Sequence, residues 1–225
     1  MVRYEIEAKR TALLVIDMTN DFVGPQAPYD VPAGREMIPR LTSLVKVCRA
    51  NQVLVTFTTQ SHRADGSDMG RVREFHPLTC EGAALRDGTA GTQLHPAFER
   101  RTEEPLIIKR RYSAFFNTDL DLILRSGGID TLIVGGVATT MCCESTVRDA
   151  FFRDYRVIFL SDGNATHDLP DQGWGPLLAV DAQRHVMTII AFGFGEVATV
   201  AEVGARIAAP GNVSRHGAKA LHAHV

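Results

Sequence analysis

Short apolar runs alternate with longer amphipathic stretches along this chain. Six runs rich in β-branched and aromatic residues predict strands, at residues 11–17, 53–59, 105–109, 131–136, 156–161 and 186–192. Most of these runs are apolar at every position rather than at alternate positions, which is typical of strands that are covered on both faces. The pattern therefore predicts a parallel sheet.

Helical periodicity occupies the intervals between most of these runs. The predicted helices span residues 34–51, 118–126, 141–154, 175–184 and 196–208. Strands that alternate with helices in this way are typical of βαβ units, so we expect one doubly wound α/β domain.

Two segments do not follow this alternation. Residues 60–104 lack sustained periodicity and predict a long loop of functional importance. Residues 211–225 are polar and basic, and predict a tail with little to bury. Since no repeat or linker divides the remainder, we expect a single domain at residues 1–210, followed by the tail at 211–225.

Composition and charge narrow the class of partner. The 225 residues include 24 Lys and Arg against 26 Asp and Glu, a net charge of −2, which is too close to neutral for a nucleic-acid binder. The chain also shows no apolar signal-peptide core and no membrane-length apolar run. We therefore expect a cytoplasmic protein whose partner is a small molecule rather than a nucleic acid or a membrane.

The four cysteines are consistent with the cytoplasm, which is a reducing compartment. Cys48, Cys80, Cys142 and Cys143 include an adjacent pair and no CxxC spacing, which argues against both a disulfide framework and a thiolate zinc site.

Reactive side chains follow three predicted strands. Asp17 and Lys109 each end a strand, and Cys142 opens the helix that follows the fourth strand. Because ligands of open parallel sheets bind outside the carboxyl ends of the strands, these three residues are the candidate catalytic group. Singly, a strand-ending Asp or Lys is as often a helix cap or a solvated end.

Helical spacing separates the two adjacent cysteines. Cys143 shares an apolar stripe with Val147, Ala150 and Phe151, so it is interpreted as a core residue. Cys142 lies on the polar face in the first helical turn, where the helix dipole favours a thiolate. We expect Asp17 to accept the thiol proton, Lys109 to stabilise negative charge, and Cys142 to attack a carbonyl and form a thioester. The glycine-rich segment at residues 135–139, just before this helix, is expected to form a sharp turn whose backbone amides can donate hydrogen bonds to an oxyanion.

Four blocks of sequence carry a resemblance to the isochorismatase-like cysteine hydrolase superfamily. They are LLVIDMTNDF at residues 13–22, the long block from IIKRRYSAFF to TTMCCESTVRDA at 107–150, YRVIFLSD at 155–162, and the weaker HRADGSDMG at 62–70. The resemblance implies a Rossmann-like three-layer sandwich with a six-stranded parallel sheet flanked by helices. It also implies an Asp17, Lys109, Cys142 triad, a cis peptide between Val137 and Ala138, and oxyanion donors at the amides of Ala138 and Cys142. Members of this superfamily commonly form homodimers or homotetramers.

Departures from the superfamily pattern bear on cofactors. Nicotinamidases of this superfamily carry an Asp-x-His metal motif, whereas this chain reads Gln60-Ser61-His62. His62 and His76 are too few for a typical divalent site, so we expect no metal and no cofactor. His62 is interpreted either as a substrate-facing donor or as a surface histidine.

The retained cysteine favours the branch that cleaves C–N bonds, since the vinyl-ether-cleaving isochorismatases tend not to depend on one. The HRADGSDMG loop is similar to N-carbamoylsarcosine amidase and to ureidoacrylate and maleamate amidases. The resemblance thus implies hydrolysis of a small linear amide or ureido substrate with release of ammonia. Vinyl ether hydrolysis, a nicotinamidase-like activity, and metabolite binding without catalysis remain alternatives. Side chains that would contact the substrate are Asn20, Phe22, His62, Tyr112 and Phe115, although aromatic residues at such positions are also common in a core.

Overall fold

A single parallel sheet organises the protein, and its strand order is β3-β2-β1-β4-β5-β6. The computed structural model describes residues 2–209, so the predicted tail at 211–225 lies outside the described residues. The strands are β1 (Thr11–Ile16), β2 (Leu54–Gln60), β3 (Leu106–Lys109), β4 (Thr131–Val137), β5 (Arg156–Ala165) and β6 (Glu196–Ala198). The expected α/β sandwich with a six-stranded parallel sheet is confirmed.

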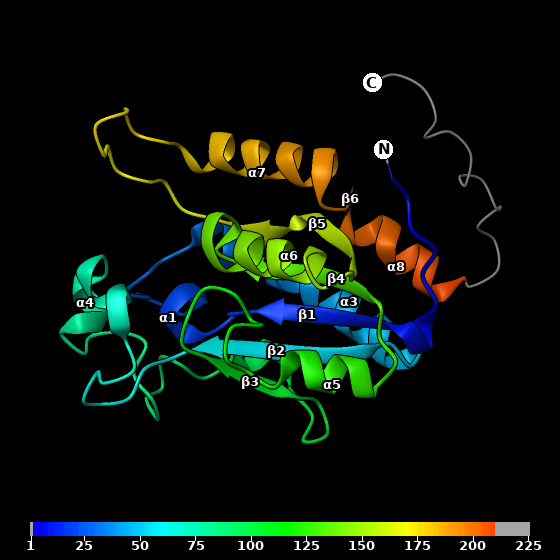
Figure 1. Ribbon diagram of the computed structural model, residues 1–225, viewed down its shortest axis with the longest axis horizontal. Coiled ribbons are helices and arrows are strands. Elements are labelled where there is room, and N and C mark those ends of the chain that lie inside the picture. Colours follow the sequence, from blue (N-terminus) through cyan, green and yellow to red (C-terminus); the bar gives the residue numbers. More distant parts are fainter. Residues whose placement is uncertain (1, 210–225) are drawn as a thin grey trace.

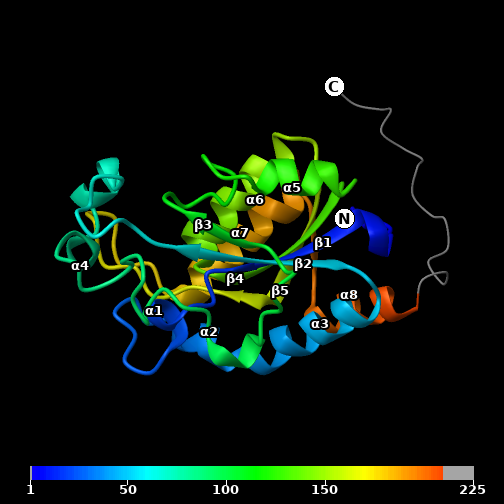
Figure 2. The ribbon, with the colours of Figure 1, turned by 90° about the horizontal axis from the view of Figure 1, so that it is seen from below.

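Helices cover both faces of the sheet, as Figure 2 shows: α1, α2, α3 and α8 lie on one side and α5, α6 and α7 on the other. The helices are α1 (Asn20–Val23), α2 (Pro32–Glu36), α3 (Ile38–Ala50), α4 (Pro77–Cys80), α5 (Leu120–Ser126), α6 (Glu144–Phe151), α7 (Ala179–Gly193) and α8 (Val200–Ala208). Short 3-10 turns lie at Ala8–Arg10, Gly70–Glu74 and Pro96–Phe98, and a π-helical turn lies at Thr139–Cys143. Between residues 2 and 209, no helix is both long and apolar enough to cross a membrane.

The alternation of side chains along β1 divides the core into two halves. Leu13 and Val15 belong to the cluster under α3 and α8, whereas Leu14 and Ile16 belong to the cluster under α5, α6 and α7. Every residue of β1 is buried, because the strand lies in the middle of the sheet with a helical layer on each side. This explains why the strand is apolar at every position.

The direction of the strand order reverses between β1 and β4. The chain runs outward from β1 through β2 to β3, and then returns to β4 on the other side of β1. Such a reversal opens a crevice at the carboxyl ends of the two strands, which is where ligands bind in this class of sheet. Asp17 follows β1 directly at this point, and the segment with Cys142 follows β4.

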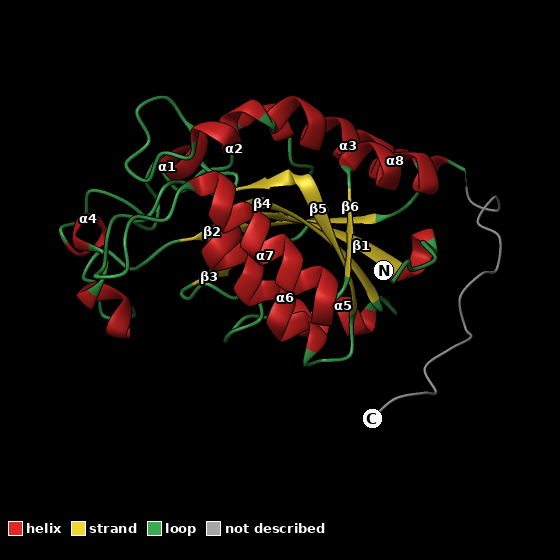
Figure 3. Ribbon diagram, turned by 90° about the horizontal axis from the view of Figure 1, so that it is seen from above, coloured by secondary structure: helices red, strands yellow, loops and turns green. Residues whose placement is uncertain are grey.

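The prediction of the sixth strand is wrong. Residues 186–192 lie in helix α7, which Figure 3 shows in front of the sheet, and the sixth strand is the three-residue β6 at the sheet edge. The apolar run is helical because Ala182, Val186 and Ile190, spaced four apart, are the buried residues of α7. A short apolar run does not by itself distinguish a strand from a buried helical segment.

All five predicted helices have different boundaries in the structure, and three of them differ most. The helix expected at residues 34–51 is divided between α2 and α3, with Met37 between them. The helix expected at 175–184 begins only at Ala179, and the helix expected at 196–208 begins at Val200 because β6 precedes it.

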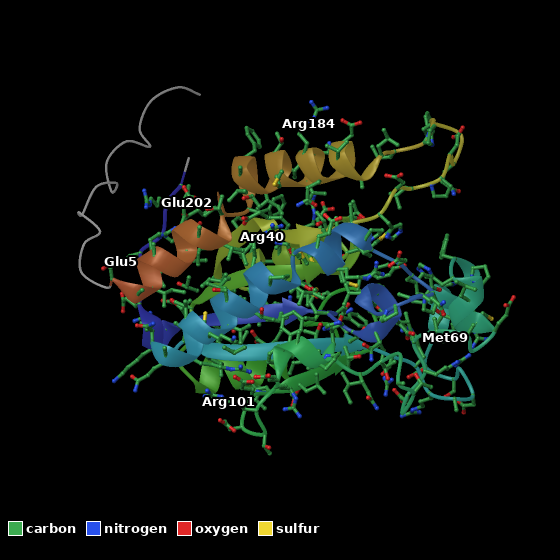
Figure 4. All side chains as sticks on the ribbon, turned by 180° about the vertical axis from the view of Figure 1, so that it is seen from behind. Glu5, Arg40, Met69, Arg101, Arg184 and Glu202 are labelled. Carbon is green, nitrogen blue, oxygen red and sulfur yellow. The ribbon has the colours of Figure 1, made fainter. Side chains whose placement is uncertain are left out.

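The long segment at residues 60–104 contains only short helical turns, as expected for a loop. Figure 1 shows α4 of this segment beyond the arrowheads of β1 and β2, and Met69 marks the same end of the molecule in Figure 4. The part of the segment around α4 therefore lies beyond the carboxyl ends of the strands.

Candidate active site

Asp17 is held rigidly at the end of β1. Its backbone has a left-handed conformation with φ of 49°, and its side chain is fully buried. The Thr58 hydroxyl donates a hydrogen bond to Asp17 Oδ1 at 2.6 Å, and the same hydroxyl oxygen accepts one from the Asp17 backbone amide at 3.1 Å. Because Thr58 lies on the neighbouring strand β2, the sheet itself fixes the direction of the carboxylate.

Lys109 connects Asp17 to Cys142. Its Nζ lies 2.7 Å from Asp17 Oδ2 and donates to Cys142 Sγ at 3.1 Å. Burial alone would lower the pKa of this fully buried ammonium, but the charge and hydrogen bonds of Asp17 and Cys142 outweigh burial and raise it. Lys109 therefore remains a cation at neutral pH. The structure thus brings Asp17, Lys109 and Cys142 together from three separate strand ends.

Cys142 lies in the π-helical turn that precedes α6, and only 4% of its surface is exposed. Burial raises the pKa of its thiol to about 12; the nearby charge of Asp17 acts in the same direction, and the Lys109 ammonium opposes it. Burial thus acts against the thiolate that the first helical turn was expected to favour.

Gln60 is a member of this cluster that the sequence did not identify. Its Oε1 accepts a hydrogen bond from Lys109 Nζ at 3.0 Å and lies 3.4 Å from Cys142 Sγ. Gln60 ends β2 and is 3% exposed, so it is buried together with the other strand-end residues of this cluster. The sequence feature that could have identified Gln60 is its position: it is a polar residue at the carboxyl end of a largely apolar strand, where ligands bind in parallel sheets.

Cys143 lies in the core, and the turn before it contains an unusual peptide bond. Cys143 is completely buried in the core cluster that includes Val147 and Ala150, as the helical spacing predicted, whereas Phe151 of the same predicted stripe is 42% exposed. The peptide bond between Val137 and Ala138 is cis. This bond leads directly into the π-helical turn, so the backbone amides of Ala138 and Cys142 both belong to the segment that carries the nucleophile.

Tyr112 is half-buried and follows Arg111, whose backbone carbonyl accepts a hydrogen bond from Lys109 Nζ at 3.3 Å. Its hydroxyl is hydrogen-bonded to His76 Nε2 at 2.8 Å, and the two rings meet edge to face. Burial raises the pKa of Tyr112, and the proximity of Cys142 adds to this rise, so the phenol lies within electrostatic range of the sulfur. Burial, followed by the proximity of His167, lowers the pKa of His76. A neutral imidazole and a neutral phenol therefore meet in this hydrogen bond at pH 7.

Phe22 and Asn20, two further predicted substrate contacts, interact with other residues of the protein. Phe22 stacks on Tyr29 and is mostly buried in the core. The side-chain amide of Asn20 donates to the carbonyl of Ala90 at 2.8 Å, while the neighbouring Asp21 carboxylate accepts from the amide of Leu85 at 2.7 Å. Both contacts fasten the long loop to the segment that follows β1.

His62 is completely buried, so its interpretation as a surface histidine is wrong. Its Nδ1 lies 3.4 Å from Asp68 Oδ1, and neither ring nitrogen makes a hydrogen bond. Burial lowers the pKa of His62, so the imidazole is neutral at pH 7. Among residues 2–209, no three His, Cys, Asp or Glu side chains are grouped so that they could hold a metal ion.

Phe115, the remaining aromatic candidate, is a core residue. Phe115 is buried against Tyr155, with ring centroids 5.7 Å apart, in the core below α5 and α6. Its burial there fits the alternative that aromatic residues near strand ends belong to the core.

Comparisons with known proteins agree with this geometry. The model of the isochorismatase domain matches residues 11–202. The chain is 34% identical over 161 residues to nicotinamidase 3 of Arabidopsis thaliana, covering 71% of this chain and 75% of that protein. It is 33% identical over 159 residues to a probable inactive nicotinamidase of the same plant, covering 70% of this chain and 81% of that protein.

Solved structures give the same result. A cysteine hydrolase from Pseudomonas syringae pv. phaseolicola 1448A superimposes with a TM-score of 0.89 at 40% identity, covering 92% of this chain and 96% of that one. An isochorismatase-like hydrolase from Alkaliphilus metalliredigens has a TM-score of 0.72 at 34% identity, covering 86% and 97%.

Proposed function

The chain belongs to the isochorismatase-like cysteine hydrolase superfamily, and from this premise we propose that it hydrolyses the C–N bond of a small linear amide or N-carbamoyl compound and releases ammonia. The observation that carries the proposal is the position of Lys109 Nζ, 2.7 Å from Asp17 Oδ2 and 3.1 Å from Cys142 Sγ. An acid-base group, a cation and a nucleophile within hydrogen-bond reach of one another are the parts that covalent acyl transfer requires.

The first half of the reaction begins from the neutral thiol. Asp17 takes the proton from Cys142 as the sulfur attacks the amide carbonyl carbon, and Lys109 offsets the negative charge that moves toward the sulfur. The amides of Ala138 and Cys142 donate to the tetrahedral oxyanion. Asp17 then returns its proton to the leaving nitrogen as the C–N bond breaks, so ammonia departs and a thioester remains on Cys142.

The second half repeats the same proton movements with water. Asp17, again a carboxylate, takes a proton from a water molecule that attacks the thioester carbon. The new tetrahedral intermediate collapses, the C–S bond breaks, and Asp17 gives its proton back to the sulfur. The product is a carboxylic or carbamic acid, and the thiol form of Cys142 is restored.

The uncharged side chains around the triad favour a substrate whose reacting group is also uncharged. His62 and His76 are held neutral by burial, and the phenol of Tyr112 is neutral as well. A primary amide or ureido group has both N–H donors and a carbonyl acceptor, which suits a phenol and an imidazole. We retain Tyr112 as the candidate substrate contact among the predicted aromatic residues.

Nicotinamide is a second candidate substrate, since two curated relatives carry the name nicotinamidase. The chain differs from the metal motif of such enzymes at Gln60, whose amide oxygen contacts Lys109. For this reason we place small acyclic amides first and nicotinamide second.

Ammonia release tests the proposal. The purified protein is incubated with ureido acids, maleamate, biuret-like compounds and nicotinamide, and ammonia is measured beside a Cys142→Ala control. We expect release from at least one compound by the wild type alone, together with an acyl adduct on the peptide that contains Cys142 after an acid quench.

A different outcome would favour the ether-cleaving alternative. Hydrolysis of a vinyl ether without ammonia, with equal rates in the wild type and Cys142→Ala, would overturn the proposal, because the sulfur would then have no part in the reaction.

A further inference from the structure

Strand β2 lies between β1 and β3, and its carboxyl end contacts both charged members of the triad (Figure 1). Thr58 donates to Asp17 Oδ1 at 2.6 Å. Gln60, two residues later, accepts from Lys109 Nζ at 3.0 Å through its amide oxygen. Because alternate residues of a strand point to the same face, Thr58 and Gln60 lie on one face of β2. The strand therefore supplies one uncharged contact for each member of the buried ion pair.

The register of the sheet places Gln60 beside Lys109. The two residues are partners in the parallel pairing of β2 with β3. Ile107, which shares a face of β3 with Lys109, is buried in the core cluster that also contains Cys142. The side chains of Gln60 and Lys109 thus leave the sheet together, on the side that carries the nucleophile. Their contact is built into the pairing of two strands rather than into a loop.

Lys109 has three N–H donors and four acceptors around them. Its Nζ lies 2.7 Å from Asp17 Oδ2, 3.0 Å from Gln60 Oε1, 3.1 Å from Cys142 Sγ and 3.3 Å from the carbonyl oxygen of Arg111. Because an ammonium can only donate, Gln60 must turn its amide oxygen, and not its nitrogen, toward Nζ. Of the three side chains in this group, Gln60 is the one whose charge stays constant throughout the proposed reaction.

A constant acceptor matters because Asp17 and Cys142 compete for the ammonium. While the sulfur carries its proton, the Asp17 carboxylate attracts Lys109 more strongly, since charge-assisted hydrogen bonds are roughly twice as strong as neutral ones. An ammonium drawn fully to Asp17 would compete with the thiol proton for the carboxylate and would leave the sulfur without a cation. The Gln60 oxygen lies 3.4 Å from Cys142 Sγ, so its hydrogen bond holds the ammonium near the sulfur.

We propose that Gln60 is a positioning residue of the hydrolase: its amide oxygen holds the Lys109 ammonium beside Cys142 Sγ, so that Asp17 can accept the thiol proton. This role of Asp17 rests on the proposed function, whereas the position of the ammonium is measurable without a substrate.

Alkylation of Cys142 by iodoacetamide reports on the ammonium, because the thiolate is the reactive form and a nearby cation favours it. At pH 9, below the thiol pKa of about 12, the alkylation rate is proportional to the thiolate fraction. Gln60→Met keeps the length of the side chain and removes the acceptor. We expect the ammonium to move toward Asp17 and alkylation to slow by about tenfold, the equivalent of one pKa unit. Tandem mass spectrometry localises the label to Cys142 rather than Cys143.

Thr59→Val is the matched control. Thr59 lies between Thr58 and Gln60 but points to the opposite face of β2, where its hydroxyl donates to the carbonyl of Thr92 at 2.8 Å. The variant therefore also loses one hydrogen bond at the end of β2, but not one near the triad. We expect it to be alkylated at the wild-type rate. Circular dichroism verifies that every variant is folded.

A second background separates an effect through Lys109 from a direct effect on the sulfur. Without the ammonium, loss of the Gln60 oxygen removes only a partial negative charge from the vicinity of Sγ, and this change favours the thiolate. In the Asp17→Asn/Lys109→Met background, Gln60→Met is therefore expected not to slow alkylation. The two mechanisms thus predict effects of opposite sign.

Three results would overturn the proposal. Unchanged or faster alkylation in Gln60→Met alone would show that the ammonium does not depend on this contact. Equal slowing in the Asp17→Asn/Lys109→Met background would show an effect that does not pass through Lys109. Equal slowing in Thr59→Val would assign the effect to a general loosening of the strand end.

Steady-state kinetics of the substrate found by ammonia release give a second readout. Gln60→Met is expected to lower kcat by about tenfold and to change KM by less than about twofold, because the contact serves the reacting groups rather than substrate binding. Slow alkylation in Gln60→Met, without ammonia release from any compound by the wild type, would contradict the proposed function and support the position of Lys109. Ammonia release by the wild type, together with wild-type alkylation in Gln60→Met, would do the reverse.

Discussion

Lys109 Nζ lies 2.7 Å from Asp17 Oδ2, and both side chains are completely removed from solvent. Each charge is therefore tolerated only because the other is present, since an unpaired charge in such a place would lose its hydration without compensation. The ion pair that serves the proposed chemistry is also part of what holds β1 and β3 in the fold.

Removal of one member of this pair is expected to cost stability. Lys109→Met leaves the Asp17 carboxylate buried without a cation, and we expect the free energy of unfolding to fall by about 3–5 kcal/mol. Urea denaturation measures this. The double variant Asp17→Asn/Lys109→Met is expected to lose less than the sum of the two single losses, because it has no unpaired charge. Strictly additive losses would contradict the coupling.

Loss of the nucleophile is expected to remove activity without loss of the fold. Cys142→Ala should reduce kcat by at least about 10³-fold, because no other side chain in the cluster can form the thioester. Its melting temperature should stay close to that of the wild type. The control is Cys143→Ala, which alters the adjacent core sulfur and should keep most of the activity. Equal losses of activity in the two variants would contradict the assignment of Cys142 as the nucleophile.

Alkaline pH is expected to destabilise the protein through its buried thiols. Burial raises the pKa of Cys48 from 9.0 to about 12 in the folded state. Above pH 9 the unfolded chain therefore loses this proton while the folded chain keeps it, so the stability present below pH 9 falls as pH rises toward 12.

A comparison with Cys48→Ala isolates this effect. The dependence of the unfolding free energy on pH between 9 and 12 should become shallower by up to ~1.4 kcal/mol per pH unit in that variant. Cys80→Ala, at an exposed position, should leave the slope as in the wild type. An unchanged slope in Cys48→Ala would show that this thiol does not titrate differently in the two states.

Gly136 is expected to tolerate no side chain. Its φ is +138°, and a Cβ atom there would lie 2.0 Å from the backbone oxygen of Ile16 on the neighbouring strand. We expect Gly136→Ala to lower the free energy of unfolding by about 3 kcal/mol or more. Gly88 also has a positive φ, of +78°, but no atom lies within 4 Å of its Cβ position, so Gly88→Ala should cost only about 1 kcal/mol. Similar losses in both variants, measured by urea denaturation, would exclude the close approach as the cause.

Sequence reasoning located the triad because parallel topology makes the positions of strand ends predictable. Once β1, β3 and β4 were identified as parallel strands, Asp17, Lys109 and the residues after β4 had to lie at the same edge of the sheet. The same reasoning failed at residues 186–192, since an apolar run of that length suits a strand and a half-buried helix equally. Only the packing of Ala182, Val186 and Ile190 against the sheet decided for the helix.

The sequence by itself determined the class of fold, the choice of Asp17, Lys109 and Cys142 as candidate catalytic residues, and the assignment of Cys143 to the core, because these follow from periodicity and the order of elements. The tertiary structure alone raised the pKa of the Cys142 thiol, since that pKa depends on how much water surrounds the group and on which charges lie nearby. It alone also brought Gln60 to Lys109. Contacts between residues distant in the chain have no signature in local sequence patterns, and they supply the details of chemistry that the pattern cannot contain.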